Sequence, residues 1–378
     1  MKKNNKTPKL RFSGYTDDWE QHKLSDVVNI GSGMDYKHLG EGNIPVYGTG
    51  GYMCSVDKAL SNDKDAIGIG RKGTIDKPYL LRAPFWTVDT LFYCIPKEDY
   101  DLDFTSCLFQ NVDWKKKDES TGVPSLSKLI ISNVGTDTPT FDEQRKIGDY
   151  FRNIDHLITL HQRKLEKLQN MKKSCLQKMF PKDGATVPEI RFSEFQGDWE
   201  ERTLGSCFDE RLESLPNGEL LSVTIGSGIK KFSELDRHDN SNTDKSKYKR
   251  VCIGDIAYNS MRMWQGASGR SPYEGIVSPA YTVVKPIGDI DTQFFAYMFK
   301  KKEIIHLFEI NSQGLTSDTW NLKYPAFSKI VVRVPRNVEE QSRIARFLLK
   351  LDELISCAEQ EIEITKRMKK GCLQKMFV

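Results

Sequence analysis

The segment from Gly68 to Gly73 carries the residues with the clearest chemical potential in this chain. It reads Gly-Ile-Gly-Arg-Lys-Gly, which matches the GxGxxG pattern of dinucleotide-binding sites. Such a site also needs a helix that opens at the third glycine, but Thr74, Ile75 and Pro78 follow, and β-branched residues and proline resist a helix. We therefore expect no dinucleotide site. The pattern leaves two alternatives open: a tight structural hairpin, or a loop that approaches a DNA groove, where arginine can make a bidentate contact to guanine.

A second loop of similar character lies in the other half of the chain. Residues 259–270 leave a predicted strand and contain Arg262, Gln265 and Arg270, and arginine and glutamine can recognise guanine and adenine edges. The two loops share almost no residues, although other segments of the two halves are similar. Two similar frames that carry different loops are expected to read two different DNA half-sites.

Further candidate contacts lie in an exposed loop and in three basic clusters. The loop at 44–52 has aromatic and flexible positions. The clusters at 115–117, 245–250 and 300–302 suit phosphates, although any one such cluster is more often a solvated surface. The predicted DNA-contacting residues are Tyr47, Thr49, Arg71, Lys72, Thr74, Lys245, Lys247, Arg262, Trp264, Gln265 and Arg270.

Motifs of catalysis are missing from the sequence. It has no GxxxxGK[ST] phosphate loop, no GxSxG or HExxH, no paired-cysteine zinc pattern and no Asn-Pro-Pro-Tyr or Asp-Pro-Pro-Tyr box. His156 and His161 lack partners that would suit a metal site. We expect no catalytic residue, cofactor or metal in this chain, so any catalysis would use an active site on another chain.

Composition places further limits on the class of protein. The net charge of the 378 residues is only +4, so a nucleic-acid surface must consist of local patches. No run of 18 apolar residues occurs, and the basic start of the chain leads to no apolar stretch, which argues against a membrane span and a signal peptide. The eight cysteines form no CxxC pair and fit free thiols in the cytoplasm.

The elements that must position these loops occur twice. Residues 8–24 return with few changes at 188–204, and residues 171–180 return at 368–377. Between them, β-branched and aromatic runs bounded by glycine or proline predict strands, and two stretches have helical character. The mixture predicts an α+β fold. The expected strands are 66–70, 86–95, 129–134, 220–225, 251–258, 275–285 and 330–334, and the expected helical stretches are 101–112 and 291–310.

Each half then ends in a long predicted helix, at 140–180 and at 337–377. Thr140 and Asn337 suit helix caps, with Glu143 and Glu340 three residues on. Each helix would be roughly 60 Å long at about 1.5 Å per residue. Apolar or equivalent residues recur in steps of four and three in the same frame in both copies, which predicts a coiled-coil seam. The seam positions are Ile147, Phe151, Ile154, Ile158, His161, Leu165 and Leu168, and then Ile344, Leu348, Leu351, Ile355, Ala358, Ile362 and Thr365.

The order of these motifs, found twice, resembles the specificity subunit of type I restriction-modification enzymes. The motifs are the Arg-Phe segment that leads to Asp-Trp-Glu, the loops at 44–51 and 70–73, the strand at 275–281, the Pro-then-Glu-Gln helix starts at 139–144 and 335–341, and the Leu-Gln-Lys-Met-Phe ends at 176–180 and 373–377. The resemblance covers nearly the whole chain.

The resemblance implies a non-catalytic subunit whose two target recognition domains bind the two parts of a split DNA sequence. It also implies partners: two methyltransferase subunits that methylate adenine, and endonuclease subunits that translocate DNA. The implied division is a recognition domain at 1–139, a spacer helix and linker at 140–187, a second recognition domain at 188–336 and a second spacer helix at 337–378, the two helices pairing antiparallel about a pseudo-two-fold axis. The alternative is a coiled-coil scaffold that binds no DNA, which would explain the helices but not the different loops.

Overall fold

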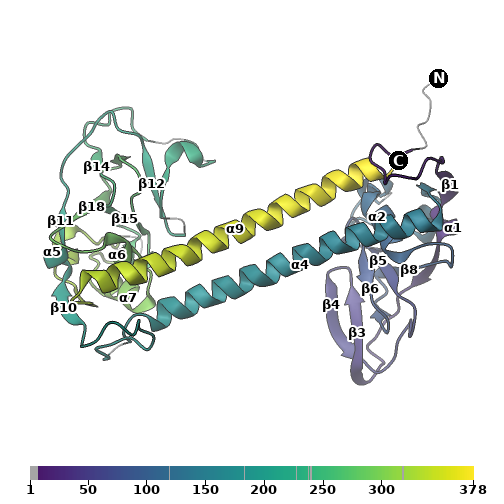
Figure 1. Cartoon of the computed structure of the whole chain (residues 1–378), viewed down its shortest axis with the longest axis horizontal. Coiled ribbons are helices and arrows are strands. Elements are labelled where there is room, and N and C mark those ends of the chain that lie inside the picture. Colours follow the sequence, from purple (N-terminus) through teal and green to yellow (C-terminus); the bar gives the residue numbers. More distant parts are fainter. Residues whose placement is uncertain are drawn as a thin grey trace. The chain divides into compact units, whose positions relative to one another are not determined.

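The computed structural model describes residues 7–118, 120–182, 184–226, 228–236, 238, 241–316 and 319–378. The chain divides into two compact units, one formed by Met1–Arg163 with Ala358–Val378 and the other by Lys164–Cys357. The long helices α4, at Phe141–Lys178, and α9, at Val338–Met376, each contribute a part to both units (Figure 1). The finer division into recognition domains and spacer helices stays a prediction.

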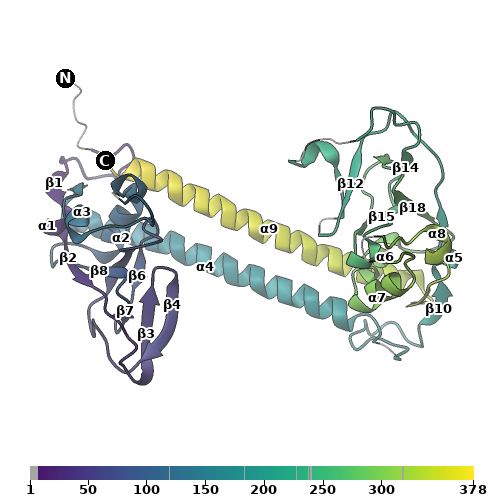
Figure 2. The same ribbon diagram turned by 180° about the vertical axis from the view of Figure 1, so that it is seen from behind.

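Unit 1, which contains residues 1–163, is built on an antiparallel sheet with the strand order β2-β8-β5-β6. A second sheet has the order β4-β3-β7, and its β3–β4 hairpin extends away from the first sheet in Figure 2. The shorter elements are β1 (Glu20–Lys23), α1 (Leu24–Val27), β2 (Val28–Ser32), β3 (Glu41–Gly48), β4 (Gly51–Val56), β5 (Ala66–Gly70), β6 (Tyr79–Leu81), β7 (Trp86–Thr87), β8 (Leu91–Pro96), α2 (Leu102–Asn111), the 3-10 helix η1 (Trp114–Lys117), α3 (Lys128–Ser132) and β9 (Gly135–Thr138).

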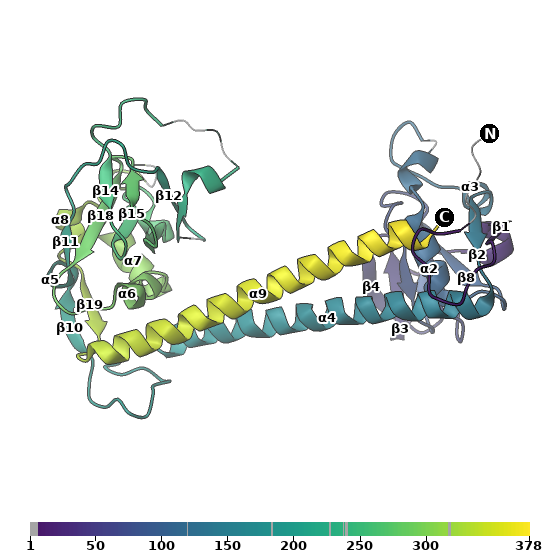
Figure 3. The same ribbon diagram turned by 45° about the horizontal axis from the view of Figure 1, so that its top comes forward.

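Unit 2 repeats this frame, because its main sheet has the corresponding order β11-β18-β15-β16. The strands β10 and β19 pair beside it, as β1 and β9 do in unit 1 (Figure 3). The elements are β10 (Glu200–Thr203), α5 (Leu204–Cys207), β11 (Phe208–Glu210), β12 (Leu221–Thr224), β13 (Gly228–Lys231), the 3-10 helix η2 (Phe232–Glu234), β14 (Lys249–Val251), β15 (Ile256–Asn259), the 3-10 helix η3 (Met263–Gln265), β16 (Ser268–Arg270), β17 (Gly275–Val277), β18 (Tyr281–Pro286), α6 (Thr292–Met298), α7 (Lys302–Ile310), α8 (Tyr324–Phe327) and β19 (Val331–Val334).

The mixed helix and strand content agrees with the predicted α+β class, but one predicted strand is wrong. Residues 129–134 were expected to be a strand, and α3 occupies Lys128–Ser132 instead. The Ser127 side chain accepts a hydrogen bond from the Ile130 N–H and starts a helix. Ile131 is buried whereas Leu129 is 71% exposed, so only part of this apolar run faces the core.

Three predicted strands are also interrupted by turns. The stretch 251–258 breaks at Gly254, whose φ is +95°. Residues 88–90 interrupt the predicted strand 86–95, and residues 278–280 interrupt the predicted strand 275–285. The predicted helical stretch 291–310 is likewise divided into α6 and α7. Each interruption separates strands or helices that join different neighbours, for example β14 with β17 and β15 with β16 and β18.

The repeated Arg-Phe segment is bound to the start of each long helix. Arg11 donates two hydrogen bonds of 2.8 Å to Glu143, whose side chain is 1% exposed. Arg191 donates to Glu340 at 2.7 and 2.8 Å in the same way. The glutamates that were predicted to complete helix caps therefore serve as buried partners of arginine, although Asn337 does accept the Glu339 N–H at 2.8 Å.

The glutamine that follows each glutamate also has the same role in both copies. The side-chain oxygen of Gln144 accepts the Asp101 N–H at 3.1 Å, and that of Gln341 accepts the Asp291 N–H at 3.0 Å. Both glutamines are buried, and they tie the helix start to the start of α2 or α6. The repeated motif therefore builds the frame.

Within each unit, α4 and α9 run antiparallel. In unit 1, Tyr150 contacts Cys372 at 3.4 Å, Asp155 contacts Lys369 at 2.7 Å and His161 contacts Glu361 at 3.0 Å, so rising numbers in α4 meet falling numbers in α9. In unit 2, Leu168, Cys175 and Leu176 pack against a core that contains Ile344, Leu348 and Leu351, and Lys172 is paired with Asp352. Among the described residues, no helix has both the length and the apolarity that crossing a membrane requires.

Candidate nucleic-acid interface

Arg71 and Lys72 are exposed on a loop whose shape depends on glycine. β5 ends at Gly70, where an added Cβ would lie 2.0 Å from the carbonyl oxygen of the half-buried Thr74. Gly73 has a φ of +93°, which side chains with a Cβ rarely adopt. The loop connects β5 to β6 through residues 71–78, so it is longer than the tight hairpin considered above.

Several contacts fix Arg71 on this loop. Its N–H donates to the carbonyl oxygen of Thr90 at 2.8 Å, and its Nη1 donates to that of Asp89 at 3.3 Å. Its guanidinium carbon lies 6.0 Å from the centre of the Phe92 ring. The guanidinium is thus oriented by residues at the start of β8. It keeps further N–H groups available for a ligand.

On the hairpin formed by β3 and β4, the predicted residues Tyr47 and Thr49 are less exposed than Tyr52. Tyr47 is half-buried, with its ring 6.4 Å from Tyr52 and 6.2 Å from Tyr79. Tyr79 donates its hydroxyl to the carbonyl oxygen at the end of β3 at 2.6 Å, and burial raises its pKa. Thr49 lies in the turn and is half-buried, whereas Tyr52 is 64% exposed and is the more accessible aromatic residue.

The corresponding loop of unit 2 combines an exposed arginine with a tryptophan pair. Arg262 is exposed just before η3. The ring of Trp264 lies 5.3 Å from that of Trp320, edge to face, and its Nε1–H donates to the Met261 carbonyl oxygen at 3.0 Å. The Oε1 atom of Gln265 is buried and has no hydrogen-bond partner among the described residues.

Arg270 and Lys300 are held by contacts within unit 2. Arg270 lies on β16, and its Nε donates to the Thr292 hydroxyl at 3.0 Å. Burial lowers the pKa of Lys300 to about 8. The Lys300 ammonium donates to three carbonyl oxygens at 2.6–3.1 Å, those of Ile225, Gly266 and Ser268. This lysine therefore holds the Arg262 loop against α6 and is not free to bind phosphate.

The other basic clusters are mostly neutralised. Lys115 lies 2.9 Å from Asp76, and this pair lowers the pKa of Asp76. Lys245 is half-buried and Lys247 exposed, and neither has an ion pair among the residues that the structure describes. The remaining pairs join Lys116 to Asp113, Lys249 to Glu210, and Arg250 to Glu213 and Glu274.

Part of the chain is similar to a known protein family. Residues 16–170 match the family described as "Type I restriction modification DNA specificity domain". This stretch, which is less than half of the chain, is similar to a type I restriction-modification DNA specificity domain. The chain is also 24% identical, over 283 residues, to the specificity subunit of the type I restriction enzyme MjaVIII from Methanocaldococcus jannaschii. That match covers 68% of this chain and 64% of the relative, so it spans less than two thirds of the relative's length.

A solved structure shares the fold of the whole chain. The type I restriction-modification S subunit from M. genitalium has a TM-score of 0.69 and 16% identity, over 98% of this chain and 99% of the other. The match over residues 16–170 and the similar specificity subunit confirm the resemblance inferred from the sequence, and the solved structure shows that the fold is shared. The DNA-contacting residues themselves stay predictions.

Each unit presents a second loop that the sequence reasoning missed. Val123 follows Gly122 and is 55% exposed. In unit 2, Leu315 follows Gly314 and is fully exposed. Each lies shortly before the short helix α3 or α8. A glycine followed by an exposed aliphatic residue at the same place in both halves was the signal that could have identified this loop.

The second loop is bound to the arginine loop in both units. In unit 1, Leu126 donates its N–H to the Arg71 carbonyl oxygen at 2.9 Å, and in unit 2 Leu322 donates to that of Ser260 at 2.8 Å. Both leucines are buried. Each unit therefore presents a pair of loops on one frame, one with an exposed arginine and one with an exposed aliphatic tip.

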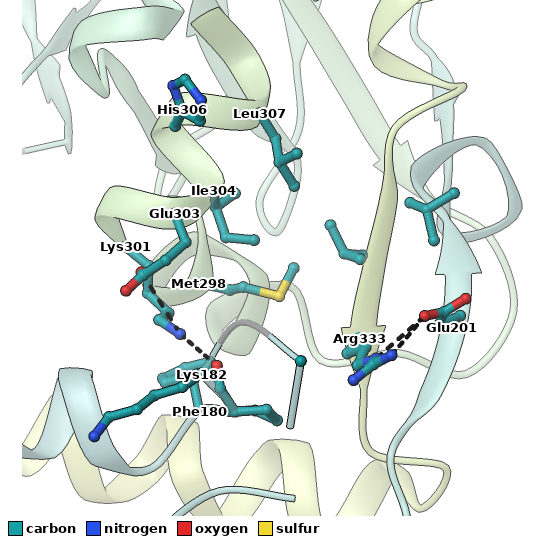
Figure 4. Close-up of a pocket in the computed structure, with 14 residues that line it drawn as sticks. Phe180, Lys182, Glu201, Met298, Lys301, Glu303, Ile304, His306, Leu307 and Arg333 are labelled. Atoms are coloured by element: carbon teal, nitrogen blue, oxygen red, sulfur yellow. Dashed lines mark hydrogen bonds and ion pairs between the residues drawn. The ribbon is translucent and has the colours of Figure 1, made fainter. Parts of the chain in front are cut away.

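A hollow of about 300 Å³ lies in unit 2 beside the segment that follows α4 (Figure 4). Apolar side chains such as Met298, Ile304 and Leu307 line it. The cations at its rim are engaged within the chain, because Arg333 donates to Glu201 at 2.8 Å and Lys301 donates to the Pro181 carbonyl oxygen at 2.9 Å. The first contact joins β19 to β10. The second attaches Pro181, which follows α4, to the start of α7.

Proposed function

We propose that this chain is the sequence-specific DNA-binding subunit of a type I restriction-modification complex. Each unit reads one half of a bipartite target, and partner subunits carry out adenine methylation or restriction. One observation carries the proposal: a frame with the same sheet order in both units presents exposed arginines, Arg71 and Arg262, on loops of unrelated sequence. The similarity to a DNA specificity domain and to proteins that are specificity or S subunits supports it.

The proposal includes an arrangement and a set of partners. The helices α4 and α9 form an antiparallel coiled coil that separates two target recognition domains about a pseudo-two-fold axis. Two methyltransferase subunits and further endonuclease subunits assemble on the chain in the cytoplasm. The antiparallel contacts of α4 and α9 within each unit, such as Asp155 with Lys369 and Lys172 with Asp352, support this arrangement.

The first prediction concerns the division of labour. The purified chain alone should show no methylation, cleavage or ATP hydrolysis, because the sequence holds none of the motifs that these reactions use. Transfer of labelled methyl groups from S-adenosylmethionine to target DNA should appear only after the methyltransferase subunit is added. A DNA shift assay on the same mixture separates this function from a scaffold that binds no DNA. Methylation by the chain alone would contradict the proposal.

The second prediction concerns the two arginine loops. Arg71→Ala should relax recognition at one position in one half of the methylated motif, and Arg262→Ala should do so in the other half. The loss of a bidentate base contact costs roughly 1–3 kcal/mol of discrimination. Mapping methylated adenines in cells that carry each variant measures this. Arg346→Ala, which removes an exposed arginine on α9, is the control and should leave the motif unchanged. An Arg71→Ala complex with uniformly weaker binding and the same motif would make Arg71 a phosphate contact.

A further inference from the structure

An open hollow of about 660 Å³ beside the Arg71 loop is lined by cations and hydroxyls. Its cations are Arg71, Lys72 and Lys128, and serine hydroxyls come from several segments of unit 1, among them Ser32, Ser125 and Ser127. No carboxylate is found among its described lining residues. Lys128 was not among the residues singled out from the sequence; it directly precedes the stretch 129–134, which was predicted to be a strand.

The lack of compensating acids is local to this hollow. Nearby, Lys115 and Lys116 each lie 2.9 Å from an aspartate. By contrast, the described part of the chain shows no carboxylate paired with Lys72 or Lys128, and both are exposed. Like charges that share one hollow repel each other, and an anion placed among them converts this repulsion into attraction.

The backbone that carries the donors around the hollow is fixed before any ligand arrives. The backbone of Lys72 forms an isolated β-bridge with Ser125. The Ser127 hydroxyl oxygen accepts the Ile130 N–H at 3.1 Å, so its own O–H remains available as a donor. Lys128 follows directly in sequence. Two ammonium groups and two hydroxyls thus come from two loops that are bound to each other, which suits a tetrahedral oxyanion better than a flat base edge.

We propose that Lys72 and Lys128, with the Ser125 and Ser127 hydroxyls, bind a phosphate group of the DNA backbone. This inference rests on the proposed DNA-binding function and deepens it. The phosphate contact sets the position of the first half-site, and Arg71, which is oriented by the Asp89 carbonyl oxygen, keeps its free N–H groups for the base edge. Lys72 and Lys128 are therefore positioning residues for recognition by Arg71.

The test compares salt dependence in the assembled complex of full chain and methyltransferase subunits. Anisotropy of a labelled target duplex and of an unrelated duplex gives Kd between 50 and 200 mM salt. The variant K72Q/K128Q should weaken both duplexes by the same factor and reduce the magnitude of the slope of log K against log[salt] by about 1. The weakening should therefore be roughly fourfold larger at 50 mM than at 200 mM salt.

The matched control is K115Q/K116Q, which removes two exposed lysines of the same unit that are paired with Asp76 and Asp113. The slope of log K against log[salt] for this control should equal that of the unmodified complex. The variant K72R/K128R, which keeps both positive charges, should have a slope close to that of the unmodified complex. Titration with inorganic phosphate in the absence of DNA separates a backbone contact from a site for free phosphate. Thermal melting shows whether each variant is folded.

The outcomes are distinct. If the unmodified complex does not prefer its target duplex, the proposed function is wrong. If it does, but K72Q/K128Q leaves the slope unchanged, or K115Q/K116Q lowers it equally, the phosphate site is wrong while the function stands. A loss confined to one base position would assign Lys72 or Lys128 to a base. Tight binding of inorganic phosphate that the variant abolishes would make this a site for a free anion, which also overturns the inference.

Discussion

Replacement of Arg191 by alanine is expected to lower the free energy of unfolding of unit 2 by about 3–5 kcal/mol. The Glu340 carboxylate is 2% exposed and receives two hydrogen bonds from this arginine, and the remaining side-chain donor to it is Trp199 Nε1 at 3.2 Å. Removal of the arginine leaves a buried negative charge without its counter-ion, and this costs far more than the loss of an exposed pair. Urea unfolding of the full chain, followed by circular dichroism, measures the change.

Two controls show whether burial is the cause. Arg346→Ala breaks an ion pair with Glu339 on the same helix, but both side chains are at least 60% exposed, so the cost should stay below about 1 kcal/mol. Arg191→Lys should recover only part of the stability, because an ammonium cannot make the two parallel bonds of a guanidinium. If Arg191→Ala and Arg346→Ala destabilise the chain equally, the buried pair does not hold the frame. Arg11→Ala should act on unit 1 as Arg191→Ala acts on unit 2.

The same pair shows where sequence reasoning ends. The repeat of the Arg-Phe segment and of the Glu-Gln helix start could be recognised without a structure, and so could the long helices and the α+β class. That the arginine binds the glutamate could not be recognised, because Arg11 and Glu143 are separated by 132 positions and Arg191 and Glu340 by 149. The local spacing of the glutamate fitted a helix cap equally well. Tertiary contact decided between the two roles.

The candidate site divides in the same way. The glycines at 70 and 73 indicated a loop that exposes Arg71 and Lys72, and the geometry agrees, because local backbone conformation depends on residue type. Burial does not follow from local sequence. Lys300 lies in a run of three lysines that read as a phosphate cluster, yet it is held by three carbonyl oxygens. Lys128 is a single lysine that precedes an apolar run, and only the folded chain places it beside Lys72.

The prediction with the largest effect on the target concerns the long helices. If paired α4 and α9 set the distance between the two proposed recognition domains, lengthening both helices should lengthen the non-specific gap of the target. The pairs His161–Glu361 and Lys172–Asp352 indicate that seven residues inserted after Leu165 and seven after Cys357 would lie opposite each other. One heptad keeps the seam in frame and adds about 10 Å at ~1.5 Å per residue, or about three base pairs at roughly 3.4 Å each.

The rotation of DNA sharpens this test. Three added base pairs turn the second half-site by roughly 100° around a duplex of about 10.5 base pairs per turn, so one heptad should lower activity strongly. Three heptads in each helix add about 31 Å, close to one full turn of about 34–36 Å, and should restore activity with a gap about nine or ten base pairs longer. Both half-sites should be unchanged in methylation maps, because the arginine loops are untouched. An insertion of the same length in only one of the two helices breaks the pairing and serves as the control. An active enzyme that keeps the original gap after both helices are lengthened would show that the helices do not set it.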